Sequence, residues 1–138
     1  MSSRRQQQAG FTLIEIMVVI LILGLLATLV VQSLRGATDK AKRTKAMADI
    51  AELKTALDRY YIDNGSYPSS DQGLQALVSP PGGQGGDPEG YIKRVPNDPW
   101  NHPYVYQSDG NTYTLKSLGA DGAEGGTGKN ADIDASQF

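Results

Sequence analysis

The sequence predicts an α+β chain in which one long amino-terminal helix packs its second half on a small antiparallel β-sheet and loops. Three observations lead to this prediction. An apolar run opens the chain, an amphipathic pattern of helical period continues beyond it, and most of the glycines and prolines follow residue 64. The 138 residues suffice for one domain and not comfortably for two.

The opening apolar run, Phe11–Val31, contains 21 residues and one charge, Glu15. At about 1.5 Å of rise per residue, a helix of that length matches the hydrocarbon core of a bilayer, about 30 Å thick. A secretory signal peptide has a shorter apolar segment and a small-x-small cleavage site, which Val31-Gln32-Ser33 matches poorly. A buried core helix would not need so continuous a run. The sequence therefore predicts a membrane span.

Flanking charge does not orient this span. Arg4 and Arg5 precede it, and five basic residues follow it: Arg35, Lys40, Lys42, Arg43 and Lys45. Because basic residues gather on the cytoplasmic side of a membrane, the count on the two sides is ambiguous. A more specific signal must decide the orientation.

Residues 10–15, Gly-Phe-Thr-Leu-Ile-Glu, supply such a signal, because a basic leader precedes them and a long apolar helix follows. This motif resembles the processing site of type IV pilins and of type II secretion pseudopilins. The resemblance implies that a prepilin peptidase cuts after Gly10, removes residues 1–10 as a leader and methylates the new amino terminus at Phe11. A glycine before the cut lets extended backbone enter a narrow protease cleft.

The same resemblance implies how the mature chain is divided. Residues 11–34 would form a single transmembrane and assembly helix in a bacterial inner membrane. Residues 35–138 would form a periplasmic domain, in which the helix continues to about residue 63 before loops, a β-hairpin and a carboxyl-terminal loop.

Glu15 lies inside the apolar run, where a carboxylate costs on the order of 3 kcal/mol to insert into a membrane. Cleavage after Gly10 would create a positive amine at Phe11, one helical turn away. Opposite charges in an apolar phase attract strongly when paired and are costly apart. The spacing permits pairing within one chain, and the family resemblance implies pairing with the amine of a neighbouring subunit. Glu15 is thus predicted to be an assembly residue.

An amphipathic stripe extends the helix beyond the span. Its apolar members recur at spacings of three and four: Ile50, Leu53, Leu57, Tyr60 and Tyr61. Asp63-Asn64-Gly65 predicts the end of the helix, since asparagine and glycine suit a left-handed terminal residue. Related pilins usually have proline at position 32, so the glutamine found there leaves open whether the helix loosens between Gly24 and Gln32.

The second half of the chain predicts short elements joined by loops. A short helix is expected near Gln72–Val78, a loop at 82–90, and two strands at Pro103–Gln107 and Thr112–Ser117. The turn Ser108–Asn111 would join the strands into a hairpin. We expect Trp100 and the tyrosines to pack this sheet on the helix face that carries Leu53 and Leu57.

Three segments sharpen the resemblance when taken in order: residues 57–78, 90–100 and 117–133. Together with the amino-terminal motif they resemble the major pseudopilin of type II secretion over nearly the whole chain. Two departures stand out. The family usually has glycine after Asp98-Pro99-Trp100, where this chain has Asn101, and commonly ends in Gly-Asn-Trp, where this chain has Asp-Ala-Ser-Gln-Phe.

The glycine-rich segment 118–134 contains oxygen ligands that suit calcium, which takes six to eight oxygens in irregular geometry. The candidates are Asp121, Glu124, Asn130, Asp132 and Asp134. Spacing alone favours a solvated acidic loop over a calcium site, because no EF-hand pattern occurs. The family resemblance implies a calcium ion. Its ligands would be the side chains of Asp121 and Asp132, the carbonyls of Leu118 and Ala123, and Asn130.

Composition excludes several function classes. The chain has no cysteine, and His102, its single histidine, lies in a proline-flanked turn with no evident nucleophile, so no enzyme is predicted and His102 is expected to be a surface residue. Residues 60–138 hold four basic and ten acidic residues, which disfavours nucleic acid. Lys42, Arg43, Lys45, Asp49 and Glu52 are candidates for pairing between subunits.

The resemblance implies a structural function: the main subunit of a helical homopolymer, the periplasmic pseudopilus, which exports folded proteins. It implies as further partners minor pseudopilins, the prepilin peptidase, and an inner-membrane assembly platform with its ATPase. Alternatives are a type IV pilin, a minor or tip pseudopilin, and a membrane-anchored binding module that acts as a monomer.

Overall fold

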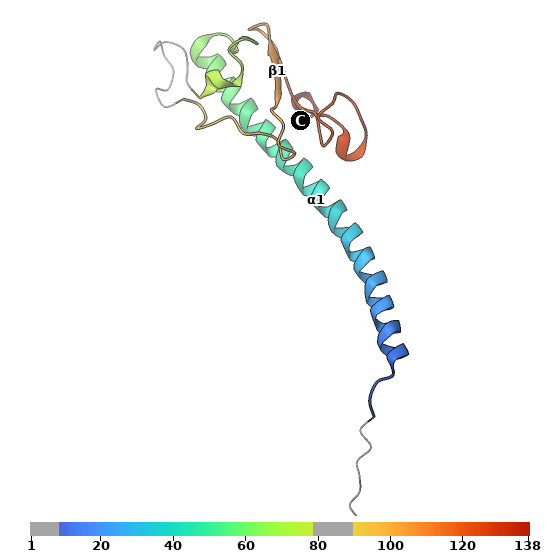
Figure 1. The fold of residues 1–138 in the computed structure, drawn as a ribbon. Coiled ribbons are helices and arrows are strands. Elements are labelled where there is room, and N and C mark those ends of the chain that lie inside the picture. Colours follow the sequence, from blue (N-terminus) through green and yellow to red (C-terminus); the bar gives the residue numbers. More distant parts are fainter. Residues whose placement is uncertain (1–8, 79–89) are drawn as a thin grey trace, which may run out of the picture. The chain divides into compact units, whose positions relative to one another are not determined.

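The structure, a computed structural model, describes residues 9–78 and 90–138. Its elements along the chain are α1 (Leu13–Asn64), η1 (Leu74–Leu77), β1 (Val105–Ser108), β2 (Tyr113–Ser117), η2 (Gly128–Asn130), β3 (Ile133–Asp134) and η3 (Ala135–Gln137), where η marks a 3₁₀-helix (Figure 1). Contacts divide the chain into two compact units, Met1–Thr38 and Asp39–Phe138. The helix α1 contributes residues to both units.

The helix α1 runs unbroken for 52 residues, through Gly24 and Gln32. It ends at Asn64, and the next residue, Gly65, has a φ of 76°. The Gly65 amide donates to the Tyr61 carbonyl at 2.7 Å, and the Asn64 side chain donates to the Tyr60 carbonyl at 2.9 Å. These bonds satisfy carbonyls that the last turn leaves free, and the predicted end of the helix is confirmed.

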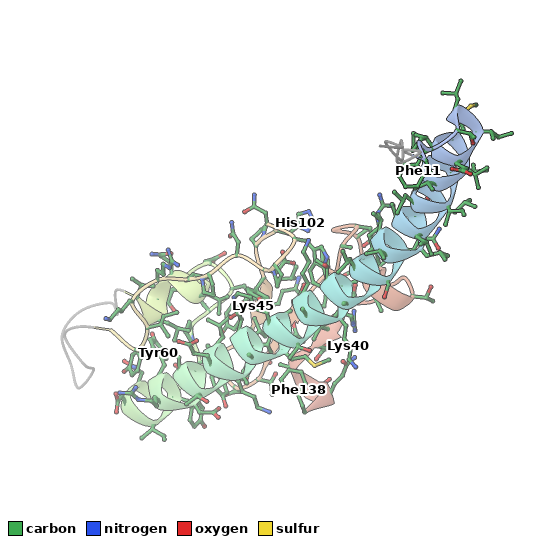
Figure 2. The ribbon with its side chains drawn as sticks, turned by 90° about the horizontal axis from the view of Figure 1, so that it is seen from below. Phe11, Lys40, Lys45, Tyr60, His102 and Phe138 are labelled. Carbon is green, nitrogen blue, oxygen red and sulfur yellow. The ribbon has the colours of Figure 1, made fainter. Side chains whose placement is uncertain are left out.

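In the first unit, α1 buries none of its large apolar side chains. Figure 2 shows them pointing away from the helix axis on every side. Their exposed fractions range from 45% at Ile16 to 79% at Leu13. An 18-residue window of α1 has a mean hydropathy of 2.9, so this helix is long and apolar enough to cross a membrane.

In the second unit, the core forms between one stripe of α1 and the segments that follow it. Ile50, Leu53 and Leu57 on the helix are at most 1% exposed, and Leu115 and Ile133 on the strands are fully buried. Figure 1 shows the strands beside this part of α1. Burial of each such side chain contributes about 1.5–3 kcal/mol. The predicted stripe is confirmed as the core face except at Tyr61, which is 40% exposed.

The three strands form an antiparallel sheet in the order β1-β2-β3. Val105 lies opposite Lys116 and Ser108 opposite Tyr113, so the predicted hairpin is confirmed. The first strand was predicted two residues too early, because Pro103 forms only an isolated bridge with Asn97. Proline has no N–H for a continuous ladder. The two-residue β3 was not predicted.

Asp109 fixes the hairpin turn. Its Oδ1 accepts hydrogen bonds from the amides of Asn111 at 2.9 Å and Thr112 at 2.8 Å. These backbone bonds, that of Thr112 first, hold the pKa of the exposed Asp109 carboxyl below its ordinary value. Gly110 takes a φ of 90°, which a side chain would disfavour.

Aromatic side chains surround the core, as predicted. Tyr60 and Tyr91 meet edge to face with ring centroids 5.5 Å apart, and Tyr67 and Tyr113 do so at 4.7 Å. Trp100 is partly buried against the core. The helix expected at Gln72–Val78 is the shorter η1, whose Leu74 and Leu77 are buried. The loop expected at 82–90 lies, except for Gly90, outside the described residues.

Asn101 adopts the left-handed conformation, with a φ of 66°, and is the one non-glycine residue among those described that has a positive φ. It occupies the position at which the family resemblance implied glycine. Asparagine is among the residues that tolerate this conformation best. The departure therefore preserves the turn between Trp100 and His102.

This turn yields a stability prediction. We expect Asn101→Ala to lower the free energy of unfolding by about 1 kcal/mol, because alanine is strained at positive φ. Asn101→Gly should stay within about 0.5 kcal/mol of the natural chain. Urea unfolding of the full chain in detergent, followed by the fluorescence of Trp100, measures both. Equal stabilities of the alanine and glycine variants would contradict the left-handed assignment.

Candidate functional site

The amino-terminal site lies at the first turn of α1. The Thr12 amide donates to Oε2 of Glu15 at 3.3 Å, and the Glu15 amide donates to Oγ1 of Thr12 at 3.3 Å. This reciprocal pair is a capping box, in which Thr12 and Glu15 satisfy two free backbone donors. The T-x-x-E spacing at residues 12–15 is the sequence signal for it, and our sequence reasoning missed it.

The capping box leaves the Glu15 carboxylate beside exposed apolar groups. Phe11 is 84% exposed and Ile14 69% exposed, while Val18, in the next turn, is 47% exposed. In the first unit the side-chain partner of Glu15 is thus a neutral hydroxyl residue. Among residues 9–78 and 90–138 no cation forms an ion pair with Glu15, and its pairing with an amine at Phe11 stays a prediction.

The second candidate site is the loop that follows β2, residues 118–132. Close backbone approaches at two glycines hold its ends together. A Cβ added at Gly119 would lie 2.8 Å from the Asn130 carbonyl oxygen, and one at Gly126 would lie 2.7 Å from the same atom. The Ala120 amide also donates to the Lys129 carbonyl at 3.0 Å. The segments that carry Leu118 and Asp121 are thereby brought beside those that carry Asn130 and Asp132.

Arg43 of α1 also holds this loop. Its Nη1 donates to the carbonyls of Gly128 at 3.2 Å and Ala131 at 2.9 Å. Lys45 and Asp49 pair with each other at 2.8 Å. Arg43, Lys45 and Asp49 thus have partners within their own chain, and their pairing between subunits stays a prediction. Asp49 also accepts from the Tyr104 hydroxyl, and burial, followed by this bond, raises the pKa of Tyr104.

The predicted calcium ligands differ in what they already contact. Oδ1 of Asp121 accepts from the Ala123 amide at 3.2 Å. Oδ1 of Asp132 is buried and has no hydrogen-bond partner among the described residues. A buried carboxylate oxygen without a partner costs about 1–3 kcal/mol, which a bound cation would offset. This orphaned oxygen fits a cation site.

Backbone carbonyls in the loop fit a cation as well. Among the hydrogen bonds of residues 9–78 and 90–138, the carbonyls of Leu118, Ala123 and Asn130 accept none. The described residues contain no cluster of three or more acidic, histidine or cysteine side chains that could hold a metal. Any cation here would therefore depend on carbonyls in addition to Asp121 and Asp132.

Lys116 contributes a positive charge to this loop, and our sequence reasoning missed it. Its Nζ lies 2.8 Å from Oε1 of Glu124 and 3.7 Å from Oδ2 of Asp132. The bond to Glu124 raises the pKa of Lys116, and the ammonium in turn lowers the pKa of the Glu124 carboxyl. Alternation along β2 places Lys116 on the sheet face opposite the core, but only the tertiary structure shows which carboxylates meet it there.

Asp98 joins the loop to the rest of the fold. It is 4% exposed, and it accepts hydrogen bonds from the His102 amide at 2.8 Å and the Ser117 hydroxyl at 2.7 Å. The Ser117 oxygen accepts from the Gly119 amide at 3.3 Å. The His102 side chain is 38% exposed, and a Cβ at Gly122 would lie 3.1 Å from its ring. His102 is thus a residue of a surface turn, as expected.

Comparison with known proteins identifies the family. Residues 33–136 match the family described as type II secretion system (T2SS), protein G. The chain belongs to this protein G family. Residues 5–31 also match the prokaryotic N-terminal methylation motif.

Relatives of protein G are similar over almost the whole chain. The type II secretion system core protein G of Pseudomonas aeruginosa is 51% identical over 136 residues, which cover 94% of this chain and 96% of the relative. That of Vibrio cholerae is 50% identical over 139 residues, with coverage of 94% and 92%.

A solved structure agrees with this assignment. The crystal structure of the major pseudopilin from the type 2 secretion system of enterohaemorrhagic Escherichia coli has a TM-score of 0.62 and 36% identity. The match covers 75% of this chain and 90% of that chain. The pilin-like fold predicted from the sequence is confirmed. The chain is a major pseudopilin of type II secretion, a structural subunit and not an enzyme.

The close approaches in the loop yield a stability prediction. Gly119→Ala and Gly126→Ala should each lower the free energy of unfolding by about 2–4 kcal/mol, through strain at positive φ and a clash with the Asn130 carbonyl. Gly125→Ala is the matched control, because Gly125 has a φ of 84° and nothing within 4 Å of an added Cβ. It should lose only about 1–2 kcal/mol.

Urea unfolding followed by Trp100 fluorescence measures the three variants together. A loss for Gly125→Ala as large as those for Gly119→Ala and Gly126→Ala would contradict the proposed contacts with Asn130, since backbone strain alone would then explain every change.

Proposed function

We propose that this protein G chain polymerises through α1 into the shaft of a periplasmic pseudopilus that drives the export of folded proteins. The observation that carries this proposal is that every large apolar side chain among the described residues of the first unit is exposed, from Phe11 to Leu34. Removing apolar surface from water gains roughly 25 cal/mol per Å². Such a surface must be covered by lipid before assembly and by helices of other copies after it.

Processing by a prepilin peptidase is part of this proposal. The match of residues 5–31 to the N-terminal methylation motif supports cleavage after Gly10 and methylation at Phe11. In the structure, regular helix begins at Leu13, so the Gly10–Phe11 bond lies in non-helical backbone. A protease can bind such backbone without first unwinding a helix.

Glu15 would then change partners during assembly. Before assembly its carboxylate is used locally, in the capping box with Thr12. We propose that it pairs in the filament with the amine at Phe11 of a neighbouring copy, because a desolvated ion pair holds two helices in one register. Minor pseudopilins, the inner-membrane platform and its ATPase complete the proposed assembly.

We propose further that the loop 118–132 binds one calcium ion. Asp121 and Asp132 would supply carboxylates, Leu118 and Ala123 carbonyls, and Asn130 a further oxygen. The unpartnered Oδ1 of Asp132 and the free carbonyls support this assignment. Bound calcium would cross-link the two ends of the loop and stabilise the second unit.

The shaft proposal yields a test with two matched variants. Glu15→Gln keeps a capping-box acceptor and removes the charge, whereas Thr12→Ala removes the capping hydroxyl and keeps the charge. We expect Glu15→Gln to reduce fibres by at least tenfold and Thr12→Ala to leave at least half of them. Electron microscopy of cells that overexpress the whole secretion system, with antibody against this chain, counts the fibres.

A normal number of fibres from Glu15→Gln would contradict the proposed ion pair between Glu15 and the amine at Phe11 of a neighbouring copy. A chain that forms no fibres under any condition, yet supports secretion, would favour instead a monomeric membrane-anchored binding module.

The calcium proposal is tested by titration calorimetry of the full chain in detergent. We expect one site per chain, a higher unfolding midpoint in calcium than in chelator, and loss of both effects in Asp132→Asn. Asp71→Asn removes an exposed carboxylate outside the loop and should bind as the natural chain does. Absence of heat and of any stability change in the natural chain would remove the calcium site.

A further inference from the structure

Lys116 lies on the face of the sheet that points away from the core. In β2 the neighbouring residues Leu115 and Ser117 are fully buried, whereas the Lys116 side chain keeps 22% of its surface exposed. Because successive side chains of a strand point to opposite faces, Lys116 cannot share the environment of Leu115. The loop 118–132 folds back over this outer face and brings carboxylates to it.

Two carboxylates share the Lys116 ammonium unequally. Glu124, whose side chain is 76% exposed, contacts it at 2.8 Å. Asp132, whose side chain is only 20% exposed, approaches it at 3.7 Å through Oδ2. Nothing among the described residues bonds to the other oxygen of Asp132, Oδ1, although that oxygen is buried. Asp132 is therefore only partly compensated by the lysine.

We propose that Lys116 is a built-in cation that competes with calcium for Asp132 and so sets the affinity of the loop. This inference rests on the calcium site proposed above. Without calcium, the ammonium neutralises the acidic loop and holds it against the sheet. With calcium, the same ammonium is a like charge close to a shared ligand, which opposes binding.

Lys116 lies close enough to Asp132 for its charge to act on that carboxylate with little screening by salt. The ammonium lies 3.7 Å from a carboxylate oxygen of Asp132, well inside a Debye length of about 10 Å at 0.1 M salt. Arg43, a second cation that contacts the loop, bonds to the carbonyls of Gly128 and Ala131 rather than to a carboxylate. Among the described residues, Lys116 is the cation that forms an ion pair with a proposed calcium ligand, Asp132.

A salt bridge that only stabilises the loop predicts different effects of removing Lys116 than a lysine that competes with calcium for Asp132. If Lys116 only stabilised the loop, its removal would lower stability equally with and without calcium and would leave the affinity unchanged. A competitor has two effects of opposite sign. Its removal weakens the calcium-free loop and strengthens calcium binding, so the stabilisation caused by calcium becomes larger.

The test compares Lys116→Met with Lys129→Met in the full chain in detergent. Methionine keeps much of the aliphatic stem and removes the charge. Lys129 is an exposed lysine of the same loop, so its variant is the matched control for net charge. Calorimetry with calcium chloride gives the dissociation constants, and urea unfolding in chelator, followed by Trp100 fluorescence, gives the stability of the calcium-free chain.

We expect Lys116→Met to lower the dissociation constant about tenfold and to lower the urea midpoint in chelator. Lys129→Met should change the constant by less than threefold and leave the midpoint unchanged. Lys116→Arg, which keeps the charge, should resemble the natural chain. If Lys116→Met does not fold, Lys116→Gln provides the same removal of charge.

Each outcome is decisive. Unchanged or weaker binding in Lys116→Met, with binding intact in the natural chain, overturns the role of Lys116 and leaves the calcium site standing. An equal gain in Lys129→Met also overturns it, because net charge alone would then explain the effect. Binding that appears only in Lys116→Met supports competition. Binding in no variant rejects the calcium site and this inference with it.

Discussion

The fold of the second unit depends on covering one stripe of α1. Ile50, Leu53 and Leu57 would be exposed on an isolated helix, and the chain that follows has only short elements with which to bury them. Three strands of two to five residues cannot form a stable sheet alone, since sheets so small need a packing surface. The sheet and this part of α1 therefore stabilise each other through their shared apolar interface.

Sequence reasoning found the features that have a period or a characteristic residue type. The apolar stripe predicted the core face, and Asn64-Gly65 predicted the end of α1. The hairpin was visible because Asp109-Gly110 interrupts two alternating segments. Strand β3 could not be predicted, because two residues carry no period and its pairing with β2 is set by the loop between them.

The candidate sites show the same division. The T-x-x-E capping box was readable from spacing, since it is local to one helical turn. The contacts of Arg43 and Lys116 were not, because their partners lie far along the chain or across a loop of irregular backbone. The reach of a long cationic side chain is set by tertiary structure. The residue types of the loop predicted its oxygen ligands, whereas the cations that contact the loop could be identified only from the structure.

Arg43 has a topological consequence. Its bond to the Ala131 carbonyl joins positions 88 residues apart in a chain that has no cysteine. Secreted domains often close such a long segment with a disulfide, which narrows the unfolded ensemble and requires an oxidant. In this chain the hydrogen bond from the Arg43 guanidinium closes the segment instead, and it forms only in the native state. Maturation of this half of the molecule therefore needs no thiol chemistry, and a reducing environment leaves the closure intact.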